Sequence, residues 1–475
     1  MRTRRWQAGM RVAVATATAG LVCIGAAACT PDGQTPAPAS SAPAGPAQVT
    51  LAVYGPDAVN SAYTRAAAAF SAEHPEVSVS VKPYASREQA LAAADRDEGA
   101  PDIFLADHDD LDQLLANDRT QPVSEMLTER NIDLGDNYQR IGVEDFSRDN
   151  ALQCMPAEVS PTVVYYNAGL VRLSALRPPG DPAPNSDSGW RFNDFVTAIQ
   201  QASARGGDVR GFALPPRVES LAPFLFSGGS TVVDDADDPT RLELSEGSGL
   251  SVMKRVLPVL RNPSQTVTSA QLAEKSAVQR FKDGELAMIA GQRDLVPQLR
   301  ATKGLSFGVM PIPRVGSTAT TGTVTGFCVS RGATEDKQKA TAVGDLLAYL
   351  VGDDASTRVA ATGYVVPANL TALNSDEFTQ SDLDPLGGDT VFSNSVRYIQ
   401  ELPSTQEFPT ALAAADRVLR PLFNESVSGP LDEDQLQQRL LAVDQAAQRV
   451  LAPASLTPTP SPSAKDTPSI SPTGN

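Results

Sequence analysis

Short strands and amphipathic helices alternate along the central part of this chain, and this order restricts the possible folds more than any other feature. Residues 49–54 alternate between apolar and polar side chains, and residues 62–72 carry apolar side chains at helical spacing. Residues 77–81 then alternate again as a second strand does. This β-α-β order predicts an α/β protein with mostly parallel sheets covered by helices on both faces.

The alternation continues to residue 451, which gives ample material for more than one hydrophobic core. Ligands in sheets of this kind bind beyond the carboxyl ends of the strands. The further strands that we predict are at 103–105, 162–166 and 211–214, and the further helices are at 85–94, after 107, through 195–199, at 338–350 and at 436–451.

The N-terminus has the pattern of an export signal. Arginines precede an uncharged stretch rich in Ala and Val, and the small residues 25–28 lead to Cys29. We therefore predict a lipoprotein signal peptide at 1–28, lipidation (palmitate) of Cys29, and a position in the cell membrane on the extracytoplasmic side. A membrane-spanning anchor and ordinary cleavage without lipid are the alternatives, and the export route, Sec or twin-arginine, stays open.

Two segments have compositions that do not support a packed core. Residues 29–48 are rich in Pro and Ala, and residues 452–475 are rich in Pro, Ser and Thr. Such segments bury too little apolar surface to offset the entropy of ordering them. We predict a disordered tether and a disordered tail, and the tail is a candidate for glycosylation.

The chain is acidic, with a net charge of −17 at pH 7. The charged residues of the predicted signal peptide are all arginines, so the mature chain is more acidic still. Nucleic acid and anionic lipid surfaces are therefore excluded as partners. His74 and His108 are the two histidines, and their spacing to the cysteines does not fit a zinc site. The sequence predicts no metal and no cofactor.

Two of the four cysteines remain once Cys23 is assigned to the signal peptide and Cys29 to lipidation. Exported proteins meet oxidising conditions, so we predict a disulfide between Cys154 and Cys328. Two buried thiols are the alternative.

Several short motifs occur in an order that is specific when taken together. They are Phe70 with His74-Pro75 and Val77; Ala100-Pro101-Asp102-Ile103; Pro156 through Tyr165-Tyr166-Asn167; Gly284-Glu285-Leu286-Ala287-Met288; Phe307-Gly308-Val309 with Pro311 and Pro313; Lys339-Ala340; and Gly363 through Ala368. In this order the chain resembles the extracellular solute-binding proteins of family 1, which include maltose- and other sugar-binding components of ABC importers.

This resemblance implies a two-lobed fold of the periplasmic-binding-protein type II, with a ligand cleft between the lobes. It implies an N-terminal lobe of residues 49–157 and 314–365 and a C-terminal lobe of residues 158–313 and 366–451. The partners that follow are a small-molecule solute and the permease subunits of an importer, and we expect a monomer. Because closure brings both lobes onto the ligand, the importer can recognise the closed form.

The resemblance also implies which residues face the cleft. They are Tyr54, Asp57, Asp107, His108 and Asp109 from the first lobe, and Ser160, Arg217, Glu219, Arg293 and Asp294 from the second. Carboxylates can accept hydrogen bonds from sugar hydroxyls, and we expect Arg293 to be the foremost contact. Helix capping is the alternative role for the aspartates, and surface ion pairing is the alternative for the arginines.

The sequence departs from its sugar-binding relatives in its aromatic residues. Besides Trp6 in the signal peptide, Trp190 is the one tryptophan, so a phosphate-bearing polyol is an alternative to an oligosaccharide. The residues left for stacking on a sugar ring are Tyr54, Phe224, Tyr364 and Phe392. A sensor or accessory lipoprotein with the same fold is the alternative function. No nucleophile elbow or Walker loop is present, so we do not predict an enzyme.

Overall fold

The computed structural model describes residues 45–379, 385–424 and 429–452 of the 475 in the chain. The predicted signal peptide, most of the predicted tether and nearly all of the predicted tail lie outside these ranges. The described residues from Pro46 onward belong to one compact unit. Within the described ranges, no helix combines the length and the apolar character that crossing a membrane requires.

The first part of the chain builds most of a six-stranded sheet, with the order β2-β1-β3-β12-β4 and with β7 also paired to β12. The β1 strand runs parallel to β2 and β3, as the β-α-β pattern predicts. The elements of this part are β1 (Ala47–Tyr54), α1 (Asp57–Glu73), β2 (Val77–Tyr84), α2 (Arg87–Ala94), β3 (Ile103–Asp107), η1 (His108–Asp110), α3 (Leu111–Ala116), β4 (Thr120–Gln121), α4 (Ser124–Thr128), α5 (Leu134–Asn137), α6 (Arg140–Asp145), β5 (Ser147–Arg148), β6 (Ala151–Leu152) and β7 (Cys154–Pro161).

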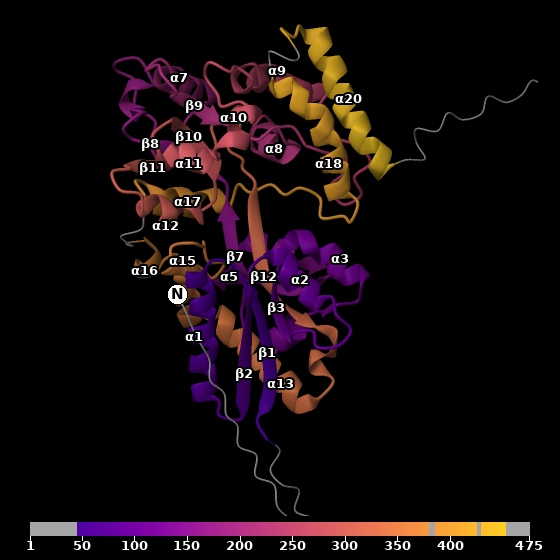
Figure 1. Cartoon of the computed structure of the whole chain (residues 1–475). Helices are drawn as coiled ribbons and strands as arrows, with labels where there is room; N and C mark the ends of the chain where they lie inside the picture. Colours follow the sequence, from indigo (N-terminus) through magenta and orange to yellow (C-terminus); the bar gives the residue numbers. More distant parts are fainter. Residues whose placement is uncertain (1–44, 380–384, 425–428, 453–475) are drawn as a thin grey trace, which may run out of the picture. The chain divides into compact units, whose positions relative to one another are not determined.

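The middle part of the chain builds a four-stranded sheet with the order β11-β8-β10-β9. Figure 1 shows this sheet and its helices in one half of the view, and the six-stranded sheet in the other. The elements of this part are β8 (Val163–Asn167), η2 (Leu173–Ala175), α7 (Phe192–Ser203), β9 (Arg210–Ala213), α8 (Val218–Ser227), α9 (Gly247–Leu260), α10 (Ser269–Glu274), α11 (Ala277–Lys282), β10 (Leu286–Gly291), α12 (Leu295–Arg300) and β11 (Phe307–Met310).

The last part of the chain contributes to both regions. The β12 strand joins the six-stranded sheet, whereas α18 and α20 pack against each other and against the α8 and α9 helices of the four-stranded sheet. The elements of this part are β12 (Gly322–Ser330), η3 (Arg331–Thr334), α13 (Lys337–Val351), α14 (Asp353–Ala360), α15 (Leu370–Leu373), α16 (Asp376–Thr379), α17 (Gly388–Val396), α18 (Phe408–Leu419), η4 (Arg420–Phe423) and α20 (Glu433–Leu451).

Both sheets are mixed, so the prediction of mostly parallel sheets holds for only part of each. The β12 strand is antiparallel to β3, β4 and β7, and β8 is antiparallel to β10 and β11. A parallel neighbour requires a crossover connection, usually through a helix. The β8 and β12 strands enter their sheets directly from the other region. No helical crossover within the same sheet precedes them, so they can run antiparallel to their neighbours.

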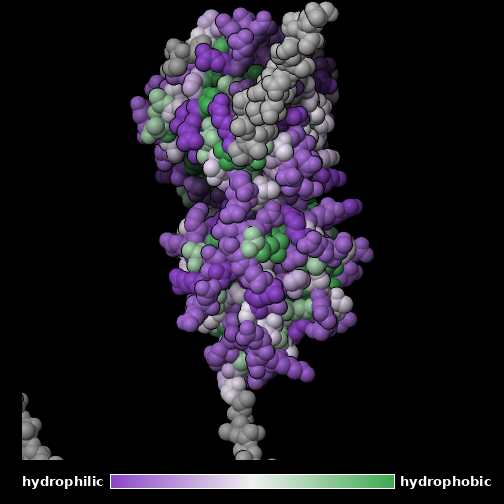
Figure 2. Space-filling view, turned by 90° about the vertical axis from the view of Figure 1, so that its right-hand side faces the viewer, coloured by the Kyte–Doolittle hydropathy of each residue, from purple (hydrophilic) through white to green (hydrophobic). Residues whose placement is uncertain are grey.

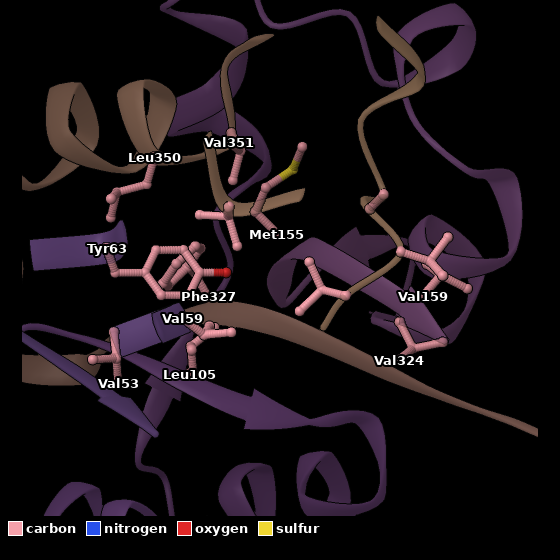
Figure 3. Packing of buried hydrophobic residues seen from close by; sticks show 14 of the residues in the cluster. Val53, Val59, Tyr63, Leu105, Met155, Val159, Val324, Phe327, Leu350 and Val351 are labelled. Carbon is pink, nitrogen blue, oxygen red and sulfur yellow. The ribbon is translucent and has the colours of Figure 1, made fainter. Parts of the chain in front are cut away.

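Two hydrophobic clusters fill the molecule. The first surrounds the six-stranded sheet, and Figure 3 shows its centre, where Tyr63 and Phe327 pack edge to face with ring centroids 5.4 Å apart. The second lies between the four-stranded sheet, α7, α8 and α18. Alternate residues of β8 belong to different clusters, Tyr165 to the first and Val164 to the second. The four-stranded sheet is therefore buried on both faces. The face of the molecule drawn in Figure 2 is mostly hydrophilic, with apolar side chains in small groups.

The β7 strand lies at the crossing between the two regions. It pairs with β12 on one side, and on the other side Val159 and Ala157 exchange backbone hydrogen bonds with residues 366–368. Cys154 on β7 and Cys328 on β12 are register partners and form a disulfide, as the sequence predicts. Several strands thus meet where the chain passes from one region to the other.

The predicted strands and helices are present, and most of them extend two to five residues beyond the predicted bounds. The lobe boundaries remain a prediction, because the described residues form one compact unit. The α15 and α16 helices pack against α14 on the side of the six-stranded sheet. The segment from residue 366 to α16 therefore stays with the first region, whereas α17 packs against β7 and against β8 and β11 of the four-stranded sheet.

Candidate functional site

A cavity of about 740 Å³ is lined by residues from both sheet regions. We call the side formed by residues 87–113 the first wall, the side formed by residues 213–224, 277–312 and 408–412 the second wall, and residues 400–404 the strap. The lining residues used below are Arg87, His108, Asp109 and Asp110 of the first wall, Glu219, Phe224, Ile289, Gln292, Phe408 and Leu412 of the second wall, Glu401 and Leu402 of the strap, and Thr162 and Thr323 at the crossing.

The first wall begins where β3 ends. Asp107 closes β3 and is buried, and its carboxylate accepts hydrogen bonds from the Tyr54 hydroxyl and, at 2.8 Å, from Thr325. The Asp107 backbone N–H donates to Asp110, which caps the short η1 helix. Burial raises the pKa of Asp107 despite the nearby positive charge of Arg87. Asp107 therefore supports the wall from behind and does not line the cavity itself.

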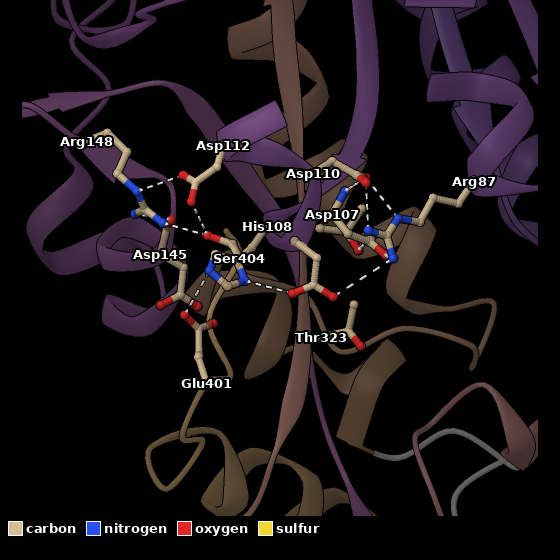
Figure 4. A network of polar contacts seen from close by, with 12 residues as sticks. Arg87, Asp107, His108, Asp110, Asp112, Asp145, Arg148, Thr323, Glu401 and Ser404 are labelled. Atoms are coloured by element: carbon tan, nitrogen blue, oxygen red, sulfur yellow. Dashed lines mark hydrogen bonds and ion pairs between the residues drawn. The ribbon is translucent and has the colours of Figure 1, made fainter. Parts of the chain in front are cut away.

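Arg87 connects the carboxylates of this wall (Figure 4). Its guanidinium donates to both oxygens of Asp110, at 2.9 and 2.7 Å, and lies 3.2 Å from Asp107. A bidentate pair of this kind fixes both side chains. Asp109 lies farther away, at 4.0 Å. The positive charge of Arg87 is therefore largely balanced by aspartates of the protein.

The strap is held to the first wall by polar contacts (Figure 4). Nε2 of His108 lies 3.2 Å from Glu401, and Nδ1 lies 3.3 Å from Asp109. Ser404 donates to Asp112 at 2.9 Å, and Asp112 also pairs with Arg148 at 3.4 Å. The segment that leads into α18 is thereby attached to the six-stranded sheet region.

Glu401 sits beside a second carboxyl group, Asp145 of α6. Burial raises the pKa of Glu401, and the hydrogen bond to Asp145 and its charge raise it further. Burial also raises the pKa of Asp145. Since two adjacent buried carboxyl groups rarely ionise together, this pair holds a proton at neutral pH.

The second wall is mainly apolar. Phe224, Ile289, Phe408 and Leu412 supply its hydrocarbon surface. Its polar groups include Gln292, whose amide donates to Thr323 at 2.7 Å, and Glu219 in the first turn of α8. An apolar surface opposite a polar one suits a ligand that has hydroxyl groups on one side and C–H groups on the other.

The predicted site residues divide into three groups. His108, Asp109 and Glu219 line the cavity. Tyr54 and Asp107 lie behind its first wall. The remaining predicted residues are not among the lining residues, namely Asp57, Ser160, Arg217, Arg293 and Asp294.

Arg293 shows most clearly where the expectation and the structure differ. Its side chain is fully buried, and its guanidinium lies over the rings of Phe378 and Phe392, at 4.1 and 5.1 Å from their centroids. Asp57, Arg217 and Asp294 are exposed at the starts of helices. Ser160 is the register partner of Thr323, which does line the cavity.

The sequence analysis missed Arg87, Asp110, Gln292, Thr323 and Glu401. Gln292 immediately precedes the predicted Arg293, and both follow β10, where strand alternation no longer indicates which of the two faces the cavity. Glu401 follows an irregular segment, so no local pattern pointed to it. Of the four candidates for stacking, Phe224 lines the cavity, and Tyr54, Tyr364 and Phe392 are not among the lining residues. Trp190 is buried and donates to the Pro311 carbonyl at 2.7 Å.

Metal binding was tested on the same residues. Among the residues that the structure describes, no three His, Cys, Asp or Glu side chains converge in a way that could hold a metal ion. The carboxylates of the cavity are distributed along its walls.

Solved structures with the same architecture are two-lobed solute-binding proteins. An ABC substrate-binding protein of Listeria monocytogenes, in complex with cycloalternan, has 15% sequence identity and a TM-score of 0.67, and the match covers 84% of this chain and 98% of that chain. A cyclic alpha-maltosyl-1,6-maltose binding protein of Arthrobacter globiformis has 15% identity and a TM-score of 0.67, with 86% and 99% covered. A maltotriose binding protein of Thermus thermophilus has 16% identity and a TM-score of 0.61, with 84% and 99% covered.

These similarities show that the chain has a two-lobed α/β fold. The model of the family described as bacterial extracellular solute-binding protein matches residues 65–383, which is more than half of the chain. The chain therefore belongs to this family, and the fold implied by the sequence is confirmed. A comparison with curated protein sequences found no match.

Proposed function

We propose that this protein captures a hydroxylated solute, a carbohydrate or a related polyol, in the cavity between its two sheet regions and delivers it to the permease of an ABC importer. The observation that carries the proposal is the cavity of about 740 Å³, which has a polar first wall and an apolar second wall. The chain that forms this cavity belongs to a solute-binding family. Its volume lies in the usual range for small-molecule sites. The names of the structural relatives support a sugar as the ligand class.

The crossing supports closure as the mechanism of capture. The β7 strand, β12 and residues 366–368 lie side by side where the chain passes between the regions. A hinge made of several strands allows a bending motion and resists free rotation. A ligand that contacts both walls stabilises the closed form by the difference between its affinities for the two forms.

The attachment to the membrane belongs to the same proposal. Lipid at Cys29 would hold the protein on the extracytoplasmic side, and residues 29–48 would separate the folded region from the bilayer. We expect Cys29→Ala to abolish partitioning into a detergent phase. Cys23→Ala, within the signal peptide, is the matched control and should leave it unchanged. A detergent-phase protein in the Cys29→Ala variant would contradict lipid anchoring.

Calorimetric titration of the purified protein with sugars and polyols tests capture directly. A ligand at 100 times its dissociation constant should also stabilise the fold by about 2.7 kcal/mol. Ala290→Trp places an indole in the cavity and should abolish binding, whereas Ala301→Trp on the exposed end of α12 should not. A correctly folded protein that binds nothing in the panel would contradict capture.

Uptake measurements separate transport from the alternative role in sensing. A strain that lacks the protein should fail to take up a solute identified by titration. If binding is confirmed and uptake is unchanged, the delivery step of the proposal is wrong and a sensory role is favoured.

A further inference from the structure

Carboxyl groups from three separate segments gather along the cavity. Asp109 belongs to the first wall, Glu219 to the second wall and Glu401 to the strap. Burial is the main cause that raises the pKa of Glu219, the charges of Asp416 and Asp109 raise it further, and the charge of Arg217 lowers it. Because Glu401 shares a proton with Asp145, Asp109 and Glu219 are the two of these three groups that keep a negative charge, and they line the cavity from its two walls.

The basic groups of the cavity do not balance these carboxyl groups. Arg87 is the lining residue with a permanent positive charge, within the part of the chain that the structure describes. Its guanidinium is paired with Asp110 and Asp107, and the negative charges of both aspartates depend on this one positive charge. Two aspartates against one arginine leave this group with a net negative charge. An anionic ligand would therefore find no available arginine in the first wall and would meet several carboxylates.

Asp109 and Glu219 differ from the paired aspartates in being accessible. The side chain of Asp109 is 61% exposed, and its partners are the imidazole of His108 at 3.3 Å and the guanidinium of Arg87 at 4.0 Å. Glu219 is exposed as well, and the nearest base along the chain is Arg217, which does not line the cavity. Both carboxylates are therefore within reach of a ligand group that enters the cavity.

The chemistry of these carboxylates favours an ammonium group as the ligand part that lies between them. A metal ion requires several ligands at short distance, and the described residues contain no such convergence. An ammonium group has hydrogens that point in several directions and bonds well to carboxylates that are spread around it. Sugar hydroxyls alone would add no positive charge opposite Asp109 and Glu219.

We propose that the solute carries a protonated amine among its hydroxyl groups, as an amino sugar or amino polyol does, and that the amine lies between Asp109 and Glu219. This inference rests on the proposed function, since it concerns the ligand of the same cavity. It also favours a cationic ligand over the phosphate-bearing polyol that the sequence left open. The site itself is defined by the cavity and the family, and the carboxylates determine which ligand it selects.

Calorimetric titration with a matched ligand series tests the inference. The series is glucosamine, N-acetylglucosamine, glucose and glucose 6-phosphate, together with the β-1,4-linked disaccharides of the first two. We expect the amine to bind at least tenfold more tightly than its N-acetylated counterpart, and the phosphate to show no binding. We also expect added salt to weaken binding of the amine more than binding of glucose.

Two variants and a control locate the amine. Asp109→Asn and Glu219→Gln should each reduce affinity for the amine about tenfold, and they should reduce affinity for neutral sugars by a clearly smaller factor. Asp57→Asn removes an exposed carboxylate that does not line the cavity, and it should change neither affinity. Circular dichroism of each variant confirms that it is folded.

The possible failures are distinguishable. If neutral sugars bind as tightly as amines, or if the phosphate binds best, the inference about the amine is wrong and the proposed function stands. If no member of this series and no sugar or polyol of the wider panel binds to the folded protein, both proposals are contradicted.

Discussion

The two sheet regions are stabilised by different interactions, and they present different side chains to the cavity. The region of the six-stranded sheet has a disulfide between adjacent strands and a network of partly buried ion pairs in the first wall. The region of the four-stranded sheet has a cluster of aromatic side chains, in which Phe195 packs against Trp190, Phe212 and Phe224. Polar contacts depend on direction and apolar packing does not. The comparison therefore suggests that the first wall orients the ligand and the second wall adapts to its shape.

The disulfide should give the largest difference between the regions. It closes a loop with a sequence separation of 174 residues, and the chain-entropy model gives a stabilisation of about 5 kcal/mol for a loop of this length. We expect Cys154→Ala with Cys328→Ala to lower the free energy of unfolding by about 3–5 kcal/mol in a denaturant titration. Reduction of the native protein should lower it by a similar amount. No change on reduction would contradict a stabilising bridge.

The aromatic cluster should give an effect of nearly the same size in the other region. Phe195 is fully buried, and its truncation leaves a cavity among three rings. We expect Phe195→Ala to lower the free energy of unfolding by about 3–5 kcal/mol. Phe226→Ala removes a partly buried ring on the neighbouring α8 and should cost less than half as much. Equal losses would show that the cluster has no special role.

Arg87 tests the ionic network. Its removal leaves Asp107 and Asp110 without their shared cation at the cavity edge. Because Arg87 is 32% exposed, we expect Arg87→Ala to cost about 2–3 kcal/mol, below the full cost of breaking a buried pair. Arg87→Lys keeps the charge but loses the bidentate geometry, and it should cost about half as much. Two variants with wild-type stability would contradict a structural network.

Glu158 at the crossing gives the smallest expected effect, and it depends on pH. Burial raises the pKa of Glu158 to about 7, although the hydrogen bond from Tyr63 acts in the opposite direction. The folded protein then binds a proton more tightly than the unfolded chain, so this group makes stability fall as pH rises from about 4.5 to 7. We expect Glu158→Gln to remove this fall and to stabilise the protein by about 1–3 kcal/mol at pH 8. The amide can still accept from Tyr63.

Denaturant titrations at pH 5 and pH 8 check this prediction. Glu73→Gln, at an exposed position on α1, serves as the control and should shift neither value. A pH dependence in Glu158→Gln equal to that of the wild type would show that another group controls it.

Much of the fold could be predicted because local patterns determine it. The alternation over residues 49–54 and the apolar spacing over residues 62–72 correctly predicted β1 and α1. The pairing of Cys154 with Cys328 could be predicted because few cysteines remained once the signal peptide was assigned. Strand direction in the sheets was not available from these patterns, since it depends on which region a strand enters from.

The site was less accessible from the sequence because it depends on side-chain direction. At the end of β10, Gln292 faces the cavity while the next residue, Arg293, is buried among aromatic rings. Both residues follow the strand, where no regular alternation of side chains applies, and alignment of short motifs cannot resolve a shift of one residue there. Glu401 reaches His108 only through the tertiary fold, across nearly 300 residues of sequence.

A crystal structure of the protein with the tightest ligand of the matched series would test the central claim most directly. The account predicts that the ligand occupies the cavity, with its amine within hydrogen-bond distance of Asp109 and Glu219 and its C–H face on Phe224 or Phe408. A ligand bound elsewhere, or one that contacts a single wall while the other stays apart, would contradict capture between the two sheet regions.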